Sequence, residues 1–69
     1  MVVTSEMVAN VWKIVVEPGA RVEEGDTLMV LESMKMEIPV TAPAAGTLVE
    51  LSVEEGQVVQ EGDSLARLE

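Results

Sequence analysis

The sequence predicts a small all-β domain, and three features of the chain lead to that expectation. Its aliphatic residues are mostly β-branched, with thirteen valines and two isoleucines against six leucines, and such side chains favour strands over helices. No window shows a sustained apolar period of about 3.6 residues, and Gly or Pro interrupts every candidate helix. The chain also contains an internal repeat in which shared glycines mark turns.

The repeat is visible when the sequence is shifted by 37 residues, so that 1–32 lies on 38–69. Twelve of the 32 paired positions are then identical, where this composition gives roughly three by chance. The identical pairs include four turn glycines, Gly19 with Gly56 and Gly25 with Gly62. We interpret residues 1–69 as one domain built from two similar halves.

Each copy is expected to form a strand, a turn, a short strand, a second turn and a final strand. The turns fall at Glu17-Pro18-Gly19 and Glu24-Gly25-Asp26, and at their counterparts in the second copy. The expected strands of the first copy are Val8–Val16, a short strand about Val22, and Thr27–Glu32. Those of the second copy are Thr47–Val53, a short strand about Val59, and Ser64–Leu68.

The two copies leave Ser33–Glu37 unmatched, and Lys35 is the middle of that segment. Thr27–Glu32 and Glu37–Val40 both favour extended backbone, which predicts a hairpin with three or four connecting residues and Met34-Lys35 at its tip. Pro39 limits the return strand to an edge-like or loosely paired position. If a two-fold axis relates the copies, the chain termini lie together at one end and Lys35 at the opposite end.

Composition excludes many functions. The chain has no cysteine and no histidine, which removes the thiol nucleophile, the commonest general base and the commonest zinc ligand. Its net charge of −9 is expected to repel nucleic acids and anionic membranes. There is no apolar run of membrane-spanning length and no secretory signal, so we expect a cytoplasmic protein. Trp12, the only aromatic residue, is expected to be partly buried and to serve packing.

A lysine at a hairpin tip is solvent-exposed and almost wholly protonated at neutral pH, so it is a poor nucleophile unaided. It is well placed as a handle that another enzyme deprotonates and acylates. Met34 and Met36 provide soft, adaptable contacts for such an enzyme. Glu32 and Glu37 flank the lysine and favour its charged form. The alternative interpretation is a lysine that only promotes solubility, but the unmatched segment and the paired methionines favour a function.

The segment Glu32-Ser33-Met34-Lys35-Met36-Glu37 resembles the attachment motif of the biotinyl domain family, commonly Glu-Ala-Met-Lys-Met. The resemblance extends over most of the chain, through Val16-Glu17-Pro18-Gly19, Glu24-Gly25-Asp26, Thr41-Ala42-Pro43, Gly46-Thr47-Leu48 and Glu61-Gly62-Asp63. It implies a flattened barrel-sandwich of two four-stranded antiparallel sheets related by a pseudo-two-fold axis, with the modified lysine on a hairpin tip.

The resemblance further implies that Lys35 carries biotin through an amide bond. Recognition by a biotin protein ligase would involve Met34 and Met36, together with their neighbours Glu32, Ser33 and Glu37. The chain would then be a biotin carboxyl carrier, not itself an enzyme, that shuttles a carboxyl group between a biotin carboxylase and a carboxyltransferase.

Three departures from the family pattern are visible. Ser33 replaces the common alanine, and both residues are small. Asn10 stands where a glycine often opens the first strand, and asparagine tolerates unusual backbone angles moderately well. No insertion separates the early strands, which indicates a carrier without the protruding "thumb" of some bacterial carriers.

Three other functions remain open at this point. The first is a lipoyl carrier of a 2-oxo-acid dehydrogenase or glycine-cleavage system, although its motif usually has an acid directly before the lysine. The second is an unmodified adaptor that uses the same fold for binding. An enzyme in its own right is the weakest, because no acid pair converges on a nucleophile. The sequence does not indicate which acceptor would be carboxylated.

Overall fold

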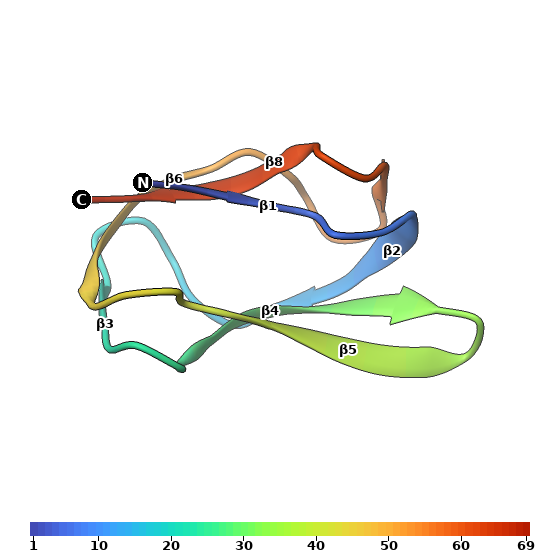
Figure 1. The fold of residues 1–69 in the computed structure, drawn as a ribbon, viewed down its shortest axis with the longest axis horizontal. Helices are drawn as coiled ribbons and strands as arrows, with labels where there is room; N and C mark the ends of the chain where they lie inside the picture. The colour runs from blue at the N-terminus through green and yellow to red at the C-terminus, as the bar shows by residue number, and fades with distance from the viewer.

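The computed structural model describes all residues from Met1 to Glu69 and contains eight strands. The strands form two four-stranded sheets with the orders β1-β8-β6-β3 and β5-β4-β2-β7 (Figure 1). All pairings are antiparallel, so the predicted fold class is confirmed. The strands are β1 (Val2–Thr4), β2 (Ala9–Ile14), β3 (Arg21–Val22), β4 (Thr27–Ser33), β5 (Met36–Thr41), β6 (Gly46–Leu51), β7 (Val58–Val59) and β8 (Ser64–Leu68).

The two sheets are exchanged by the same 37-residue shift that aligns the sequence with itself. The shift exchanges β1 with β5, β2 with β6, β3 with β7, and β4 with β8. When each strand in the order β5-β4-β2-β7 is replaced by its counterpart, the result is β1-β8-β6-β3, which is the order of the other sheet. Each half therefore contributes two strands to each sheet, and neither half has a complete sheet alone.

Backbone hydrogen bonds at the turns obey the same symmetry. The amide of Gly25 donates to the carbonyl oxygen of Ala42 at 2.9 Å, and the amide of Gly62 donates to that of Ser5 at 2.8 Å. All four turn glycines have φ between 89° and 97°, a region that side chains with a Cβ rarely adopt. Glycine at these four positions is therefore required by backbone geometry.

The hydrophobic core consists of two clusters of seven buried residues each. Most members of one cluster are related by the shift to members of the other, as Val22 is to Val59 and Leu28 is to Leu65. The largest fully buried side chains are leucines and Met29, so aliphatic packing alone fills a core that lacks aromatic residues. The first cluster is Val3, Val22, Leu28, Ala42, Leu48, Ala66 and Leu68, and the second is Ala9, Val11, Met29, Leu31, Val53, Val59 and Leu65.

The termini and the β4–β5 hairpin lie at opposite ends of the molecule (Figure 1). The molecule is elongated, with extents of 30 × 17 × 17 Å. The amino group of Met1 donates to the carbonyl oxygen of Leu68 at 2.7 Å, and the amide of Leu68 donates to the carbonyl oxygen of Met1 at 2.8 Å. The separation of the termini from Lys35 that symmetry predicted is therefore confirmed.

Several local expectations differ from the structure. The connection between β4 and β5 has two residues rather than three or four, because pairing continues to Ser33 and Met36. The strand expected at Val8–Val16 is shorter, from Ala9 to Ile14, and the one expected at Thr47–Val53 begins at Gly46 and ends at Leu51.

Trp12 is half exposed. The pairing of β2 with β4 shifts register between Val11 and Lys13, and this bulge leaves both Trp12 and Lys13 exposed. Pro39 lies on β5, which is an edge strand as expected.

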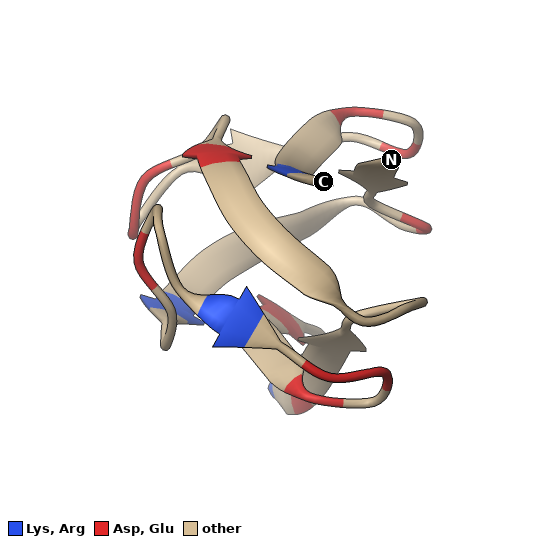
Figure 2. Cartoon of the chain, turned by 90° about the vertical axis from the view of Figure 1, so that its left-hand side faces the viewer, with Lys and Arg blue, Asp and Glu red and all other residues tan.

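The acidic residues lie mostly in the loops that connect the strands (Figure 2). Asp26 and Asp63 each accept a hydrogen bond at 2.8 Å from a backbone amide three residues earlier, from Glu23 and Gln60 respectively. Acidic side chains thus close turns at equivalent places in the two halves. No helix long and apolar enough to cross a membrane is present.

Candidate functional site

The candidate site is the tip of the β4–β5 hairpin, where Met34 and Lys35 form a two-residue turn. The flanking residues Ser33 and Met36 are paired across the hairpin. Met34 has φ of 54° and Lys35 has φ of 65°, so both central residues adopt left-handed backbone, as a type I′ turn requires. Such turns favour Asn-Gly, so the Met-Lys sequence meets the backbone requirement poorly.

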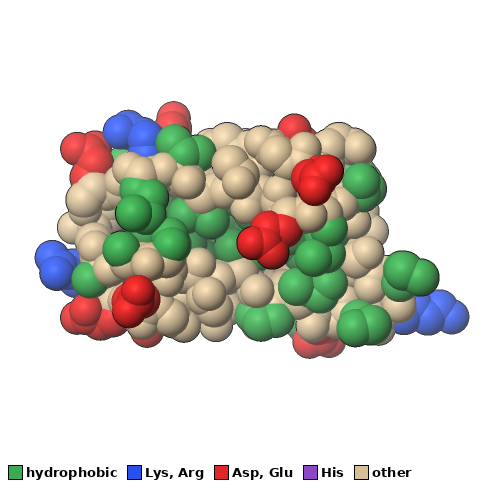
Figure 3. Space-filling model, in the orientation of Figure 1, with side chains coloured by type: hydrophobic (Ala, Val, Ile, Leu, Met, Phe, Trp, Pro, Cys, Tyr) green, Lys and Arg blue, Asp and Glu red, His purple; other side chains and the backbone are tan.

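The side chains at the tip are turned to solvent. Met34 is 91% exposed and Met36 is 62% exposed, whereas Met29 on the same hairpin is fully buried. Lys35 is also exposed. A space-filling view shows a basic side chain projecting, with hydrophobic side chains beside it, at the end where Figure 1 places the hairpin (Figure 3). Met34 and Met36 therefore contribute nothing to the core and present their thioethers to the solvent.

Two carboxylates lie one residue pair further from the tip than Ser33 and Met36. Glu32 and Glu37 are directly paired across the hairpin, and both are exposed. Both ion pairs in the structure are made by Arg67. The ammonium group of Lys35 is therefore not held by an ion pair, and Glu32 and Glu37 place negative charge next to the tip.

The structure places all six residues proposed from the sequence on one hairpin. They are Glu32, Ser33, Met34, Lys35, Met36 and Glu37, and only Ser33 is partly buried. The chain's other lysine, Lys13, is also exposed but lies within β2, next to its last residue and opposite Val30. The two lysines therefore differ in setting, because one projects from a tip and the other lies along a sheet face.

Sequence reasoning missed a hollow beside the hairpin, here called the hairpin hollow. It has a volume of about 390 Å³ and is lined by Val8, Ala9, Asn10, Glu32, Ser33, Met34, Lys35 and Val58. Half of these residues come from the start of β2 and from β7, far from the hairpin in sequence. Val8 and Val58 could have indicated this hollow, because strand alternation puts them on the solvent face of the sheet, where an apolar residue is not needed for the core.

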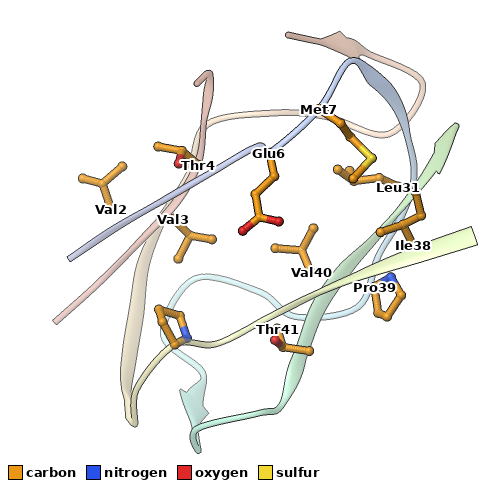
Figure 4. Close-up of a pocket in the computed structure, with 11 residues that line it drawn as sticks. Val2, Val3, Thr4, Glu6, Met7, Leu31, Ile38, Pro39, Val40 and Thr41 are labelled. Atoms are coloured by element: carbon orange, nitrogen blue, oxygen red, sulfur yellow. The ribbon is translucent and has the colours of Figure 1, made fainter. Parts of the chain in front are cut away.

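A second groove lies between the edge strands β1 and β5 (Figure 4). Its volume is about 310 Å³, and Val3, Glu6 and Val40 point into it. Leu31 and Ile38 also line this groove, but Met34, Lys35 and Met36 do not. It is therefore distinct from the tip.

The geometry limits what the chain can do chemically. No group of three or more carboxylates lies close enough together to hold a metal ion. The reactive group at the tip is a primary amine, flanked by soft thioethers and surrounded by solvent. Such an arrangement suits acylation of the amine by an outside enzyme, because the hairpin projects from the rest of the domain.

Comparisons with known proteins show which proteins this chain resembles. The family model described as "Biotin-requiring enzyme" matches residues 1–68. The biotinylated protein TB7.3 homolog of Mycobacterium leprae is 51% identical over 51 residues, which are 74% of this chain and 72% of that protein.

Two solved carboxylase structures contain a similar domain. The urea carboxylase of Kluyveromyces lactis superposes with a TM-score of 0.93 at 32% identity, over 99% of this chain and 6% of that one. A single-chain, multi-domain long-chain acyl-CoA carboxylase superposes with a TM-score of 0.90 at 35% identity, over 96% of this chain and 6% of that one. In both, the matching region is a small part of a much longer chain.

Proposed function

Since this chain belongs to the biotin/lipoyl family and its cofactor is covalently bound biotin, we propose that Lys35 is the attachment site and that the domain is a biotin carboxyl carrier. In this role it moves a carboxyl group between a biotin carboxylase and a carboxyltransferase and performs no catalysis itself. The observation that carries the proposal is the position of Lys35, which is exposed on a two-residue tip at the end opposite the termini.

Attachment requires an amide bond between the Nζ of Lys35 and the carboxyl carbon of biotin. A biotin protein ligase would supply biotin in an activated form and accept the proton that the Nζ of Lys35 loses. The nitrogen then attacks the activated carboxyl carbon and the activating group leaves. One positive charge is lost, and the formal net charge changes from −9 to about −10.

The neighbours of Lys35 fit a recognition role. Met34 and Met36 place two exposed thioethers on either side of the amine, and flexible thioethers adapt to the surfaces of different partners. Ser33 is small and leaves space beside the hairpin. Glu32 and Glu37 place negative charge next to the tip, which suits a ligase with a basic docking face.

Bound biotin would supply a ureido nitrogen that takes up a carboxyl group at a biotin carboxylase, at the expense of ATP and bicarbonate, and gives it up at a carboxyltransferase. The protein's contribution is to hold the attachment point away from the core. Because the hairpin projects from the sheets, its tip reaches into a partner's active site without disturbing packed residues. The relatedness of the fold to domains within urea carboxylase and acyl-CoA carboxylase supports this role.

The experiment measures the intact mass of the protein after incubation with a biotin protein ligase, ATP and biotin. We expect an increase of one biotinyl group in the parent chain and in Lys13→Arg, and no increase in Lys35→Arg. The arginine variants keep the charge, and both lysines are exposed, so folding is preserved. Labelling of Lys35→Arg, or loss of labelling in Lys13→Arg, would contradict the assignment.

A second measurement tests the shuttle itself. The biotinylated protein is incubated with a biotin carboxylase, ATP and labelled bicarbonate, and label on the protein is counted after gel filtration. We expect label only in the biotinylated protein. A lipoate ligase, tested in parallel, is expected to leave the mass unchanged, and efficient lipoylation would instead support the lipoyl carrier.

A further inference from the structure

We propose that the hairpin hollow is a resting site for the biotin that Lys35 carries. This inference rests on the proposed attachment at Lys35 and goes beyond it, because it assigns a binding surface on the carrier itself. The hollow adjoins the attachment point directly, since Lys35 and Met34 are among its lining residues.

The hollow forms where the hairpin extends past its neighbouring strand. Pairing between β2 and β4 ends at Asn10 and Glu32, whereas pairing between β4 and β5 continues to Ser33 and Met36. Beyond the last β2–β4 pair, Val8 precedes β2 on one side and the hairpin tip continues on the other. Figure 1 shows the hairpin projecting past β2. This offset leaves a step in the surface, and the step is the hollow.

Half of the residues that line the hollow are apolar, although the hollow is open to solvent. Val8 is 55% exposed and Val58 is 57% exposed, and both line the hollow with Met34. Val58 is paired with Asn10 across β7 and β2, so the valine and the amide lie side by side. An exposed apolar group is stabilised when a ligand covers it. Biotin has an apolar ring containing a thioether, and that ring suits such a surface.

The polar groups of the hollow match the other ring of biotin. A ureido group has two N–H donors and one carbonyl acceptor, and the carboxamide of Asn10 offers both donors and an acceptor. The carboxylate of Glu32, paired with Asn10, accepts hydrogen bonds from N–H groups. The apolar and polar features of the hollow therefore correspond to the two rings of biotin. Glu32 also makes the hollow selective for a neutral group, because it repels an anionic one.

Weak contacts are sufficient because the ligand is tethered. A short flexible linker gives an effective concentration on the order of 1 mM. A site with a dissociation constant of about 1 mM for the free ligand would then be roughly half occupied on the tether. The bound and free positions would exchange readily, which keeps the biotin accessible to partners.

The test compares the unmodified and biotinylated proteins by methyl NMR, after intact mass has established loading. We expect nuclear Overhauser effects between the ring protons of biotin and the methyl groups of Val8 and Val58, with shifts in those methyl resonances on loading. Val2 is the internal control, because it is 54% exposed but lies on β1 at the end that holds the termini (Figure 1). Its resonances are expected to stay unchanged.

Two variants test whether biotin binds in the hollow or is merely held near it by its linker. Val58→Asp is expected to reduce the Overhauser effects to Val8 several-fold, and Val2→Asp, with a matched charge and a similarly exposed site, is expected to leave them intact. Val8→Ser provides a second variant should Val58→Asp fail to fold. A normal mass increase with no Overhauser effect to either valine overturns the resting site alone. An absent mass increase overturns the attachment, and the resting site with it.

Discussion

The left-handed backbone at the hairpin tip predicts that the protein becomes more stable when the tip residues are replaced. Met34 and Lys35 both have positive φ, which costs about 1–2 kcal/mol for an ordinary side chain. In Lys35→Gly this cost is removed, and the added chain entropy of glycine offsets about 0.5–1 kcal/mol of the gain. Met34→Asn gains roughly 0.5 kcal/mol, because asparagine tolerates this region better. Met34 is 91% exposed, so little packing is lost.

The double variant Met34→Asn/Lys35→Gly is therefore expected to gain about 1.25 kcal/mol in free energy of unfolding. For a domain of this size, each kcal/mol raises the melting temperature by about 4–8 °C, so the expected rise is about 5–10 °C. The assay is thermal unfolding followed by circular dichroism. Met36→Asn is the matched control, because Met36 lies in β5, where asparagine is disfavoured, and its melting temperature should fall slightly. A double variant that melts at or below the parent temperature would refute the reasoning.

Three further predictions concern the rest of the fold, each measured by urea unfolding. Gly46→Ala should lower the free energy of unfolding by about 1–3 kcal/mol, because a Cβ there would lie 2.8 Å from the carbonyl oxygen of Glu69. An unchanged urea midpoint would show that Glu69 moves aside at no cost. Leu48→Ala should lower the free energy of unfolding by about 2–5 kcal/mol, since Leu48 is fully buried. A decrease of less than about 1 kcal/mol would mean that neighbouring side chains move to fill the cavity. Asp26→Ala and Asp63→Ala should each lower the free energy of unfolding by about 1 kcal/mol, because the two carboxylates accept equivalent 2.8 Å hydrogen bonds. Clearly unequal decreases would contradict the symmetry of the turns.

The repeat explains why so much of the fold could be predicted from the sequence. Identical glycines at equivalent positions fix equivalent turns, and the strands between them follow. The strand β1 (Val2–Thr4) is not among the strands that the sequence predicts, although the shift places it on β5 (Met36–Thr41). It is only three residues long, and its pairing with β8 joins the two ends of the chain. A pairing over that sequence distance leaves no local signal.

The local details that sequence did not reveal depend on register. Nothing in the residues around Trp12 marks the bulge between Val11 and Lys13, which leaves the indole half exposed and outside both core clusters, where packing was expected. The two-residue turn was also missed, because Met34-Lys35 lacks the Asn-Gly signal of a type I′ turn. The hairpin hollow was missed because it depends on where the pairing of β2 with β4 stops.

The poor turn chemistry at the tip and the proposed role of Lys35 have a common explanation. A sequence selected only for stability would place Asn-Gly at this turn, and the chain instead has a methionine and a lysine in left-handed backbone. Because both side chains are exposed, core packing does not require them. Met34→Asn should therefore raise the melting temperature and slow biotin loading by the ligase. These opposite effects distinguish recognition from folding, because a residue kept for folding would lower both stability and loading when replaced.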